Sequence, residues 1–172
     1  MPEKILAVDD EPDMLKLLSM IIREKTPYDI VTTNNPLEAI EMAKKGGFDV
    51  VIADLKMPGL NGVELLEAIK KVDEDIPVII ITAYGTVESA IESMQKGCFD
   101  FITKPFKKEQ ILFTINKALK FVTLQKENKM LKEQLKKEIA NSQKGFSLSP
   151  IHYWLLPFLL KLFNPKNAID RS

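Results

Sequence analysis

Cysteine, histidine and tryptophan are almost missing from this sequence, which holds one of each: Cys98, His152 and Trp154. A single cysteine cannot form a disulfide within the chain, so packing must hold the fold together, as suits a reducing compartment. His152 has no histidine or cysteine companion, which argues against a zinc site built from these residue types. We therefore expect a cytoplasmic protein that is stabilised by a hydrophobic core.

A secretory signal and a long hydrophobic run are also missing. The first residues lead directly into a short apolar run with acidic residues behind it, without the long apolar stretch and cleavage site of an export signal. The apolar run at residues 151–163 is shorter than a membrane span and is interrupted by Pro157. Neither export nor membrane insertion is expected.

Net charge is absent too, because 24 basic side chains balance 24 acidic ones, but the charges are unevenly distributed. Residues 1–106 carry a net charge of −8, residues 107–140 carry +5 and residues 141–172 carry +3. The acidic first part argues against direct contact with nucleic acid, whose phosphates need a basic surface. The lysines of residues 107–140 are spread around a predicted helix, so solvation is their expected use.

Five short apolar segments recur along the first part of the chain, and each has the length of a strand. They cover residues 5–8, 28–32, 48–53, 78–81 and 99–102. The segments between them show helical periodicity, so strands alternate with helices. This alternation predicts an α/β fold with a doubly wound, five-stranded parallel sheet that is covered by helices on both faces.

Capping residues support this division into elements. Asn35 precedes Pro36, and Glu38 follows three residues after the asparagine, which predicts a helix that starts there and stops near Gly46. Thr86 is placed to cap another helix, and Gly97 is placed to end it.

The composition changes after residue 106, because neither glycine nor proline occurs in residues 107–144. This stretch, rich in Lys, Glu, Leu and Gln, predicts one helix of about 34 residues. Its second part has heptad spacing, with a and d positions at Phe121, Leu124, Asn128, Leu131 and Leu135. We expect this seam to form a parallel, homodimeric coiled coil in which Asn128 pairs with its own copy. The alternative is a solitary helix stabilised by Glu–Lys pairs.

Polar side chains stand where the predicted strands end. They are Asp9 and Asp10 after the first strand, Asp54 after the third, Thr82 and Ala83 after the fourth, and Lys104 after the fifth. In a doubly wound sheet these carboxyl ends meet at one edge, where functional residues gather. Crowded carboxylates repel one another unless a hard cation joins them. We therefore expect Mg²⁺, held by Asp10, Asp54, a backbone carbonyl of the following loop and water.

With the cation in place, Asp54 can act as a carboxylate nucleophile towards a phosphoryl group. Mg²⁺ and Lys104 would neutralise the charge that develops on the phosphoryl oxygens. Thr82 is placed to donate its hydroxyl to one of them.

Several motifs in this order resemble those of a known family. Residues 8–11 (VDDE), residues 54–62 (DLKMPGLNG), Thr82-Ala83 and Lys104-Pro105 are similar to the motifs of the CheY-like receiver domain of bacterial two-component response regulators. The resemblance covers residues 4–119. It implies a phosphoacceptor at Asp54, metal contacts from Asp9, Asp10, Asp54 and the Lys56 carbonyl, a phosphate contact from Lys104, a switch made by Thr82, Ala83 and Phe101, and a cis peptide bond before Pro105.

The long helix resembles the linker of the activators that work with the alternative sigma factor, the NtrC-like response regulators. This resemblance implies a sensor histidine kinase as the phosphoryl donor and control of transcription or of another output. We expect a receiver at residues 1–120, a coiled-coil linker at 121–140 and a tail of unknown role at 141–172. No GxxxxGK[ST] loop is present and the tail is short, so no output domain is expected.

The alternative function is a Mg²⁺-dependent, phosphatase-like enzyme that uses an aspartyl-phosphate intermediate. Such an enzyme needs an acid to protonate the leaving group, and Lys56 occupies the position two residues after Asp54. We therefore expect no enzyme, but only self-phosphorylation from a phosphodonor and autodephosphorylation.

Overall fold

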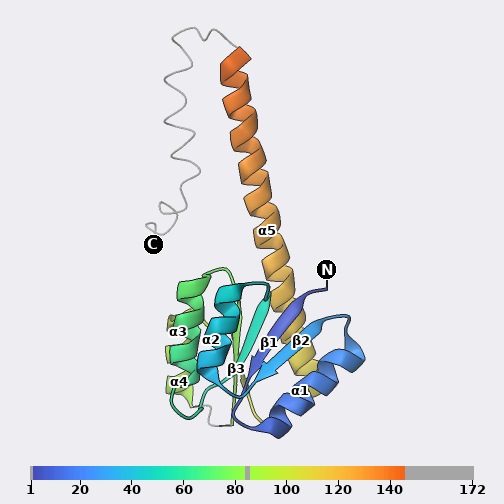
Figure 1. Cartoon of the computed structure of the whole chain (residues 1–172), viewed down its shortest axis with the longest axis vertical. Helices are drawn as coiled ribbons and strands as arrows, with labels where there is room; N and C mark the ends of the chain where they lie inside the picture. The colour runs from blue at the N-terminus through green and yellow to red at the C-terminus, as the bar shows by residue number, and fades with distance from the viewer. Residues whose placement is uncertain (1, 84–85, 146–172) are drawn as a thin grey trace. The chain divides into compact units, whose positions relative to one another are not determined.

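The computed structural model describes residues 2–83 and 86–145 (Figure 1). The elements are β1 (Lys4–Val8), α1 (Pro12–Lys25), β2 (Asp29–Thr33), α2 (Pro36–Lys45), β3 (Val50–Asp54), α3 (Gly62–Val72), β4 (Val78–Thr82), α4 (Val87–Gln95), β5 (Asp100–Thr103) and α5 (Lys108–Gly145). The chain divides into two compact units, Met1–Glu127 and Asn128–Ser172. Of the second unit, only residues 128–145 of α5 are described, so residues 146–172 of the predicted tail, with His152 and Trp154, lie outside the described residues.

The five strands form one parallel sheet in the order β2-β1-β3-β4-β5. This confirms the predicted doubly wound architecture, and the strand ends differ from the predicted ones by no more than two residues. Every residue of β3 and β4 is buried, because helices cover both faces of the central strands.

Alternating residues of the strands supply two separate hydrophobic cores. Ile5 and Ala7 of β1 pack in one core with α1 and with Ile111 and Ile115 of α5. Leu6 of β1 faces the other core, which is formed with α2 and α3. Figure 1 shows α1 and α5 on one side of the sheet and α2, α3 and α4 on the other. The period of two along each strand thus divides the apolar residues between the two faces.

Helix α4 contributes little to these cores. Neither core contains a described residue of α4. Two of its large apolar side chains are exposed, Ile91 by 52% and Met94 by 46%, while Ser93 is buried and donates its hydroxyl to the carbonyl oxygen of Ser89. Packing therefore secures α4 less than it secures α3.

The predicted helix caps are confirmed. The side chain of Asn35 accepts hydrogen bonds from the backbone N–H groups of Leu37 and Glu38, and Gly46 is the C-cap residue after α2. Thr86 caps α4 by accepting from the N–H of Ser89. These side chains satisfy N–H groups that have no partner within the helix.

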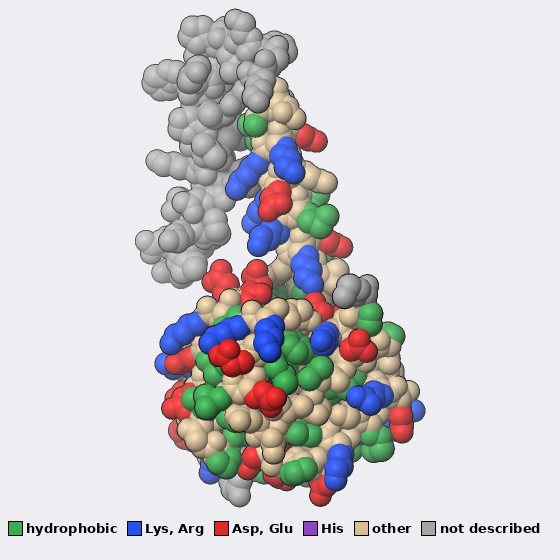
Figure 2. Space-filling view, in the orientation of Figure 1, with side chains coloured by type: hydrophobic (Ala, Val, Ile, Leu, Met, Phe, Trp, Pro, Cys, Tyr) green, Lys and Arg blue, Asp and Glu red, His purple; other side chains and the backbone are tan. Residues whose placement is uncertain are grey.

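Helix α5 is continuous over 38 residues, slightly longer than predicted. The apolar residues of the predicted seam are exposed, by 40% at Phe121, 50% at Leu124, 63% at Leu131 and 46% at Leu135. Figure 2 shows basic, acidic and apolar side chains mixed along the described part of this helix. None of the helices in residues 2–83 and 86–145 combines the length and apolar content that crossing a bilayer requires.

Candidate functional site

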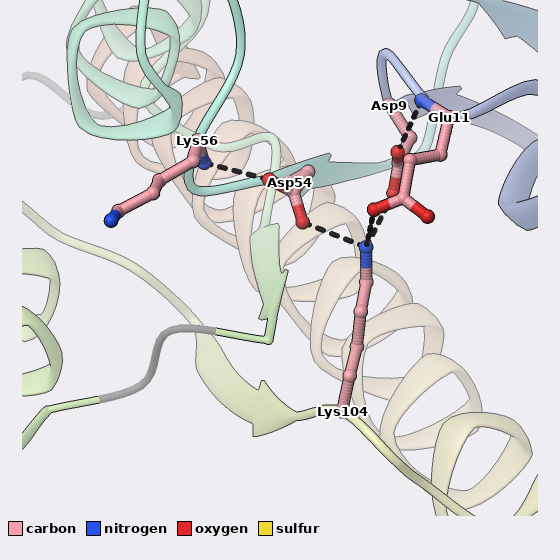
Figure 3. A network of polar contacts seen from close by, with 5 residues as sticks. All are labelled: Asp9, Glu11, Asp54, Lys56 and Lys104. Atoms are coloured by element: carbon pink, nitrogen blue, oxygen red, sulfur yellow. Dashed lines mark hydrogen bonds and ion pairs between the residues drawn. The ribbon is translucent and has the colours of Figure 1, made fainter.

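Three strands bring Asp9, Asp54 and Lys104 together at the carboxyl edge of the sheet (Figure 3). The ammonium nitrogen of Lys104 donates to Asp54 Oδ1 at 2.8 Å and to Asp9 Oδ2 at 2.9 Å. Glu11 lies further away, with its Oε1 at 3.8 Å from the same nitrogen. One ammonium group thus pairs with two carboxylates that stand at the ends of adjacent strands.

The site is shielded from water. The side chains of Asp9, Asp54 and Lys104 are exposed by only 3%, 8% and 10%. Burial raises the pKa of the Asp9 carboxyl above its usual range, and the hydrogen bonds from Lys104 and from the Glu11 N–H offset only part of this rise. Burial alone would lower the pKa of Lys104, but its bonds to Asp54 and Asp9 outweigh burial and raise it. Ionised Asp9 is therefore held at a cost that Lys104 only partly offsets.

Backbone N–H groups orient both carboxylates. The N–H of Glu11 donates to Asp9 Oδ1 at 2.8 Å, and the N–H of Lys56 donates to Asp54 Oδ2 at 2.7 Å. Each bond spans two residues, the spacing typical of a turn that an aspartate side chain stabilises. The second oxygen of each carboxylate points to Lys104. The loops after β1 and β3 therefore fix the directions of the two acidic groups.

Gly62 is a site residue that the motif reading did not single out. A Cβ atom on Gly62 would lie 2.3 Å from the carbonyl oxygen of Asp54 and 2.8 Å from the Cα of Leu55. The N–H of Gly62 donates to the carbonyl oxygen of Leu55 at 2.8 Å, so the start of α3 packs directly on the backbone that carries Asp54. The sequence feature that points to Gly62 is its place after the capping residue Asn61, at the first position of α3. Only glycine leaves room for this contact.

Of the remaining expected switch residues, Thr82 ends β4, Ala83 follows it, and Phe101 is the second residue of β5. Thr82 is fully buried and lies in register with Thr103, while Ala83 is exposed. Phe101 is partly buried and packs against the core that α2 and α3 form. The Lys104–Pro105 peptide bond is cis, the form that the resemblance implied.

Carboxylate and backbone carbonyl oxygens follow the strands that end at this edge of the sheet. Asp10 is exposed beside the buried pair of carboxylates, and the backbone carbonyl of Lys56 follows Asp54 by two residues. In the part of the chain that the structure describes, no three His, Cys, Asp or Glu side chains form a group that could hold a metal. A cation at this edge would need backbone and water oxygens in addition to carboxylates.

Comparison with known proteins agrees with this geometry. The family of response regulator receiver domains matches residues 5–116. Transcriptional regulatory protein GlrR of Escherichia coli K12 is 37% identical over 118 residues, which are 69% of this chain and 26% of that protein. Sporulation initiation phosphotransferase F of Bacillus subtilis is 38% identical over 119 residues, which are 69% of this chain and 95% of that protein.

Solved structures are also similar to this chain. The beryllofluoride-activated NtrC4 receiver domain dimer is 35% identical with a TM-score of 0.66, over 69% of this chain and 98% of that one. NtrX from Brucella abortus is 31% identical with a TM-score of 0.71, over 76% of this chain and 30% of that one. These matches do not favour the phosphatase alternative.

The extent of the matches is uneven among the relatives. The chain spans about a quarter of the length of GlrR, but nearly all of the sporulation phosphotransferase. The shared part contains Asp9, Asp54 and Lys104, which the structure brings into contact. The chain belongs to the response regulator receiver domain family, and its relatives include NtrC-like transcriptional regulators.

Proposed function

We propose that this chain receives a phosphoryl group on Asp54 from a sensor histidine kinase and then changes conformation to control an output. The observation that carries the proposal is the position of Asp54, which ends a buried strand with one oxygen bonded to Lys104 and the other to the Lys56 N–H. This carboxylate is oriented, shielded from bulk water and next to a fixed positive charge. Family membership supports the same conclusion.

The transfer forms one bond and breaks another. An oxygen of Asp54 bonds to phosphorus while the bond between phosphorus and the histidine nitrogen of the donor breaks, and that nitrogen keeps the electron pair. Lys104 already touches Asp54, so its ammonium can pair with the incoming phosphoryl oxygens. When bound, Mg²⁺ would neutralise further charge on those oxygens, held by Asp9, Asp10, Asp54 and the Lys56 carbonyl. Asp9 would act mainly through water.

The switch that we propose involves the end of β4 and a residue within β5. Thr82 would donate its hydroxyl to a phosphoryl oxygen, with Ala83 beside it, and Phe101 would move in response. The half-buried state of Phe101 supports this role, because such a ring can become more or less buried without opening the core. Hydrolysis of its own aspartyl phosphate is the only reaction that we assign to the protein beyond phosphoryl uptake.

The output that we propose is transcription, reached by way of dimerisation. GlrR is named as a transcriptional regulatory protein, and the NtrC4 receiver was solved as an activated dimer. The net charge of −8 on residues 1–106 supports regulation through a partner or a further domain and not through direct DNA contact. The proposed dimer forms through α5, where Leu124, Leu131 and Leu135 are exposed.

Phosphoryl uptake can be tested with Asp54→Asn. The variant, incubated with acetyl phosphate and Mg²⁺, should gain no phosphoryl group by intact-mass spectrometry, because the amide is a poor nucleophile. Asp75→Asn is the matched control, since Asp75 is an exposed carboxylate on the loop before β4. The control should gain one base-labile phosphoryl group, and should lose this ability when a chelator removes Mg²⁺. Uptake of one such group by Asp54→Asn would refute the proposal.

A further inference from the structure

Residues 117–126 of α5 contact the amino-terminal ends of β3 and β5, at the opposite end of the sheet from the phosphorylation site. The ring of Phe121 lies against the ring of Phe99, with centroids 5.4 Å apart and planes inclined by 48°. Tilted aromatic pairs at this separation are attractive beyond the apolar area that they bury. Phe99 in turn packs against the core formed by α1 and α5. Phe121 is thus linked through one ring to the interior of its own receiver.

Lys117 adds a second contact at the same place. Its ammonium lies 5.3 Å from the centroid of the Phe99 ring and 3.3 Å from Asp100 Oδ2. Lys117 and Phe121 are one helical turn apart, so they reach Phe99 together. A cation over an aromatic face and a carboxylate beside it are two separate attractions for one ammonium group.

Lys126 makes a third contact with a different loop. Its ammonium lies 2.7 Å from Asp49 Oδ1, and the other oxygen of Asp49 accepts from the backbone N–H of Lys4 at 3.0 Å. Asp49 is mostly buried, with 21% of its side chain exposed. The bond to Lys4 already fixes the Asp49 carboxylate. Less side-chain entropy is therefore lost when Lys126 pairs with it.

We propose that Lys117, Phe121 and Lys126 form a clamp that docks the first turns of the linker on their own receiver. The compact unit that contains the receiver ends at Glu127, one residue after the last contact of the clamp. Phe121 then belongs to the clamp and not to a seam between two helices. The dimerising face begins at Leu124, which is half exposed, and continues through Leu131.

The receiver side of the clamp lies on the strands that carry the functional residues. Asp49 directly precedes β3, which ends at Asp54, and Asp100 begins β5, which leads to Lys104. The linker is thus fixed to the starts of two strands whose opposite ends form the phosphorylation site. A displacement of either strand would be transmitted to the first turns of the linker, because β3 has only five residues and β5 only four.

Hydrogen exchange of residues 1–172 tests the clamp. Phe121→Ala should increase amide exchange across residues 117–126 by about tenfold, because local opening no longer breaks the ring pair. Alanine is the better helix former, so intrinsic helix propensity would shift the exchange in the opposite direction. Phe113→Ala is the matched control on the same helix, since Phe113 is 70% exposed. In this control, amide exchange across residues 117–126 should stay at the wild-type level.

A charge change provides the second variant. Lys126→Glu should also increase exchange at residues 117–126, because it places two carboxylates together, whereas Lys129→Glu on the next turn should not. Sedimentation of the same samples measures self-association, which distinguishes a role of Phe121 in the clamp from a role in the seam between two helices. Wild-type exchange in Phe121→Ala, or a loss of self-association in Phe121→Ala equal to that in Leu131→Asp, would overturn the proposal.

Discussion

The ammonium nitrogen of Lys104 lies 2.8 Å from Asp54 Oδ1, although the two residues are 50 positions apart in the chain. The same nitrogen also holds Asp9 at 2.9 Å, so a residue that follows β5 joins the ends of β1 and β3. Without a phosphoryl group, Lys104 is thus committed to two carboxylates. Any ligand that engages Lys104 must compete with both.

Asp9→Asn should stabilise the metal-free protein at neutral pH. The pKa of Asp9 is raised, chiefly by burial, so the stability linked to its protonation is present below the usual carboxyl pKa and is lost as the pH rises through the raised value. Replacing the buried charge by an amide should raise the free energy of unfolding at neutral pH, because the amide carries a smaller desolvation penalty. This advantage should vanish at acidic pH. The pKa of Lys104 is also raised, so its contribution is lost only in alkaline solution and does not alter this window.

Urea unfolding in the presence of a chelator measures both variants across this range. Asp10→Asn is the matched control, because Asp10 is the exposed neighbour, and its stability should differ little from the wild type. A destabilised Asp9→Asn at neutral pH would show that the bonds to Lys104 and Glu11 outweigh the burial of the charge.

Gly62→Ala should destabilise the receiver and slow phosphoryl uptake. The new methyl group would lie 2.3 Å from the carbonyl oxygen of Asp54, so either α3 or the end of β3 must move, at a cost of about 3 kcal/mol. Gly59→Ala is the control. Gly59 has a φ of +85° but nothing within 4 Å of its added Cβ, so only backbone strain of about 1 kcal/mol is expected there. Chemical denaturation and the uptake rate from acetyl phosphate check both, and equal effects would contradict the steric argument.

Thr82→Ala should still be phosphorylated but should show a weaker conformational response. Thr82 is proposed to contact the product and not to be the nucleophile, so its loss affects the switch more than the transfer. The control is Thr103→Ala, which changes the exposed residue in register with Thr82 on β5. Amide NMR spectra with and without acetyl phosphate measure the response. A full response in Thr82→Ala would place the switch elsewhere.

Leu124→Asp combined with Leu131→Asp should convert a dimer into a monomer at micromolar concentration. Both leucines are exposed, by 50% and 63%, and fall on one heptad seam, where a carboxylate would be buried against its partner. Met130→Asp provides the control, because Met130 is 61% exposed but lies off the seam. Light scattering measures the mass. A wild-type chain that stays monomeric with and without phosphodonor would favour the solitary helix stabilised by Glu–Lys pairs.

The convergence of Asp9, Asp54 and Lys104 could be predicted because parallel strands place their carboxyl ends at one edge. Once the apolar segments were identified as strands, the residues that follow them had to meet. The two neighbouring aspartates show the limit of this reasoning. Asp9 is buried and bonded to Lys104 while Asp10 is exposed, a difference that depends on the direction of the chain after β1.

The contacts of Phe121 and Gly62 could not be predicted in the same way. Heptad spacing shows only which residues share one face of the helix. It therefore assigns Phe121 to a seam and cannot predict the contact with Phe99 of the receiver. Gly62 follows a helix cap, and its proximity to the Asp54 carbonyl arises only when α3 packs beside β3. Both relationships are tertiary, and local periodicity contains no information about them.

The described side chains of α4 lie outside both hydrophobic cores, which has a consequence for how this receiver can evolve. Exposed side chains such as Ile91 and Met94 can be exchanged with little effect on the free energy of unfolding, because they occupy no core position. Mutations at these exposed positions can therefore accumulate as neutral variation while Asp54 and its neighbours stay intact. A lineage could acquire a new binding preference on this surface without passing through unstable intermediates.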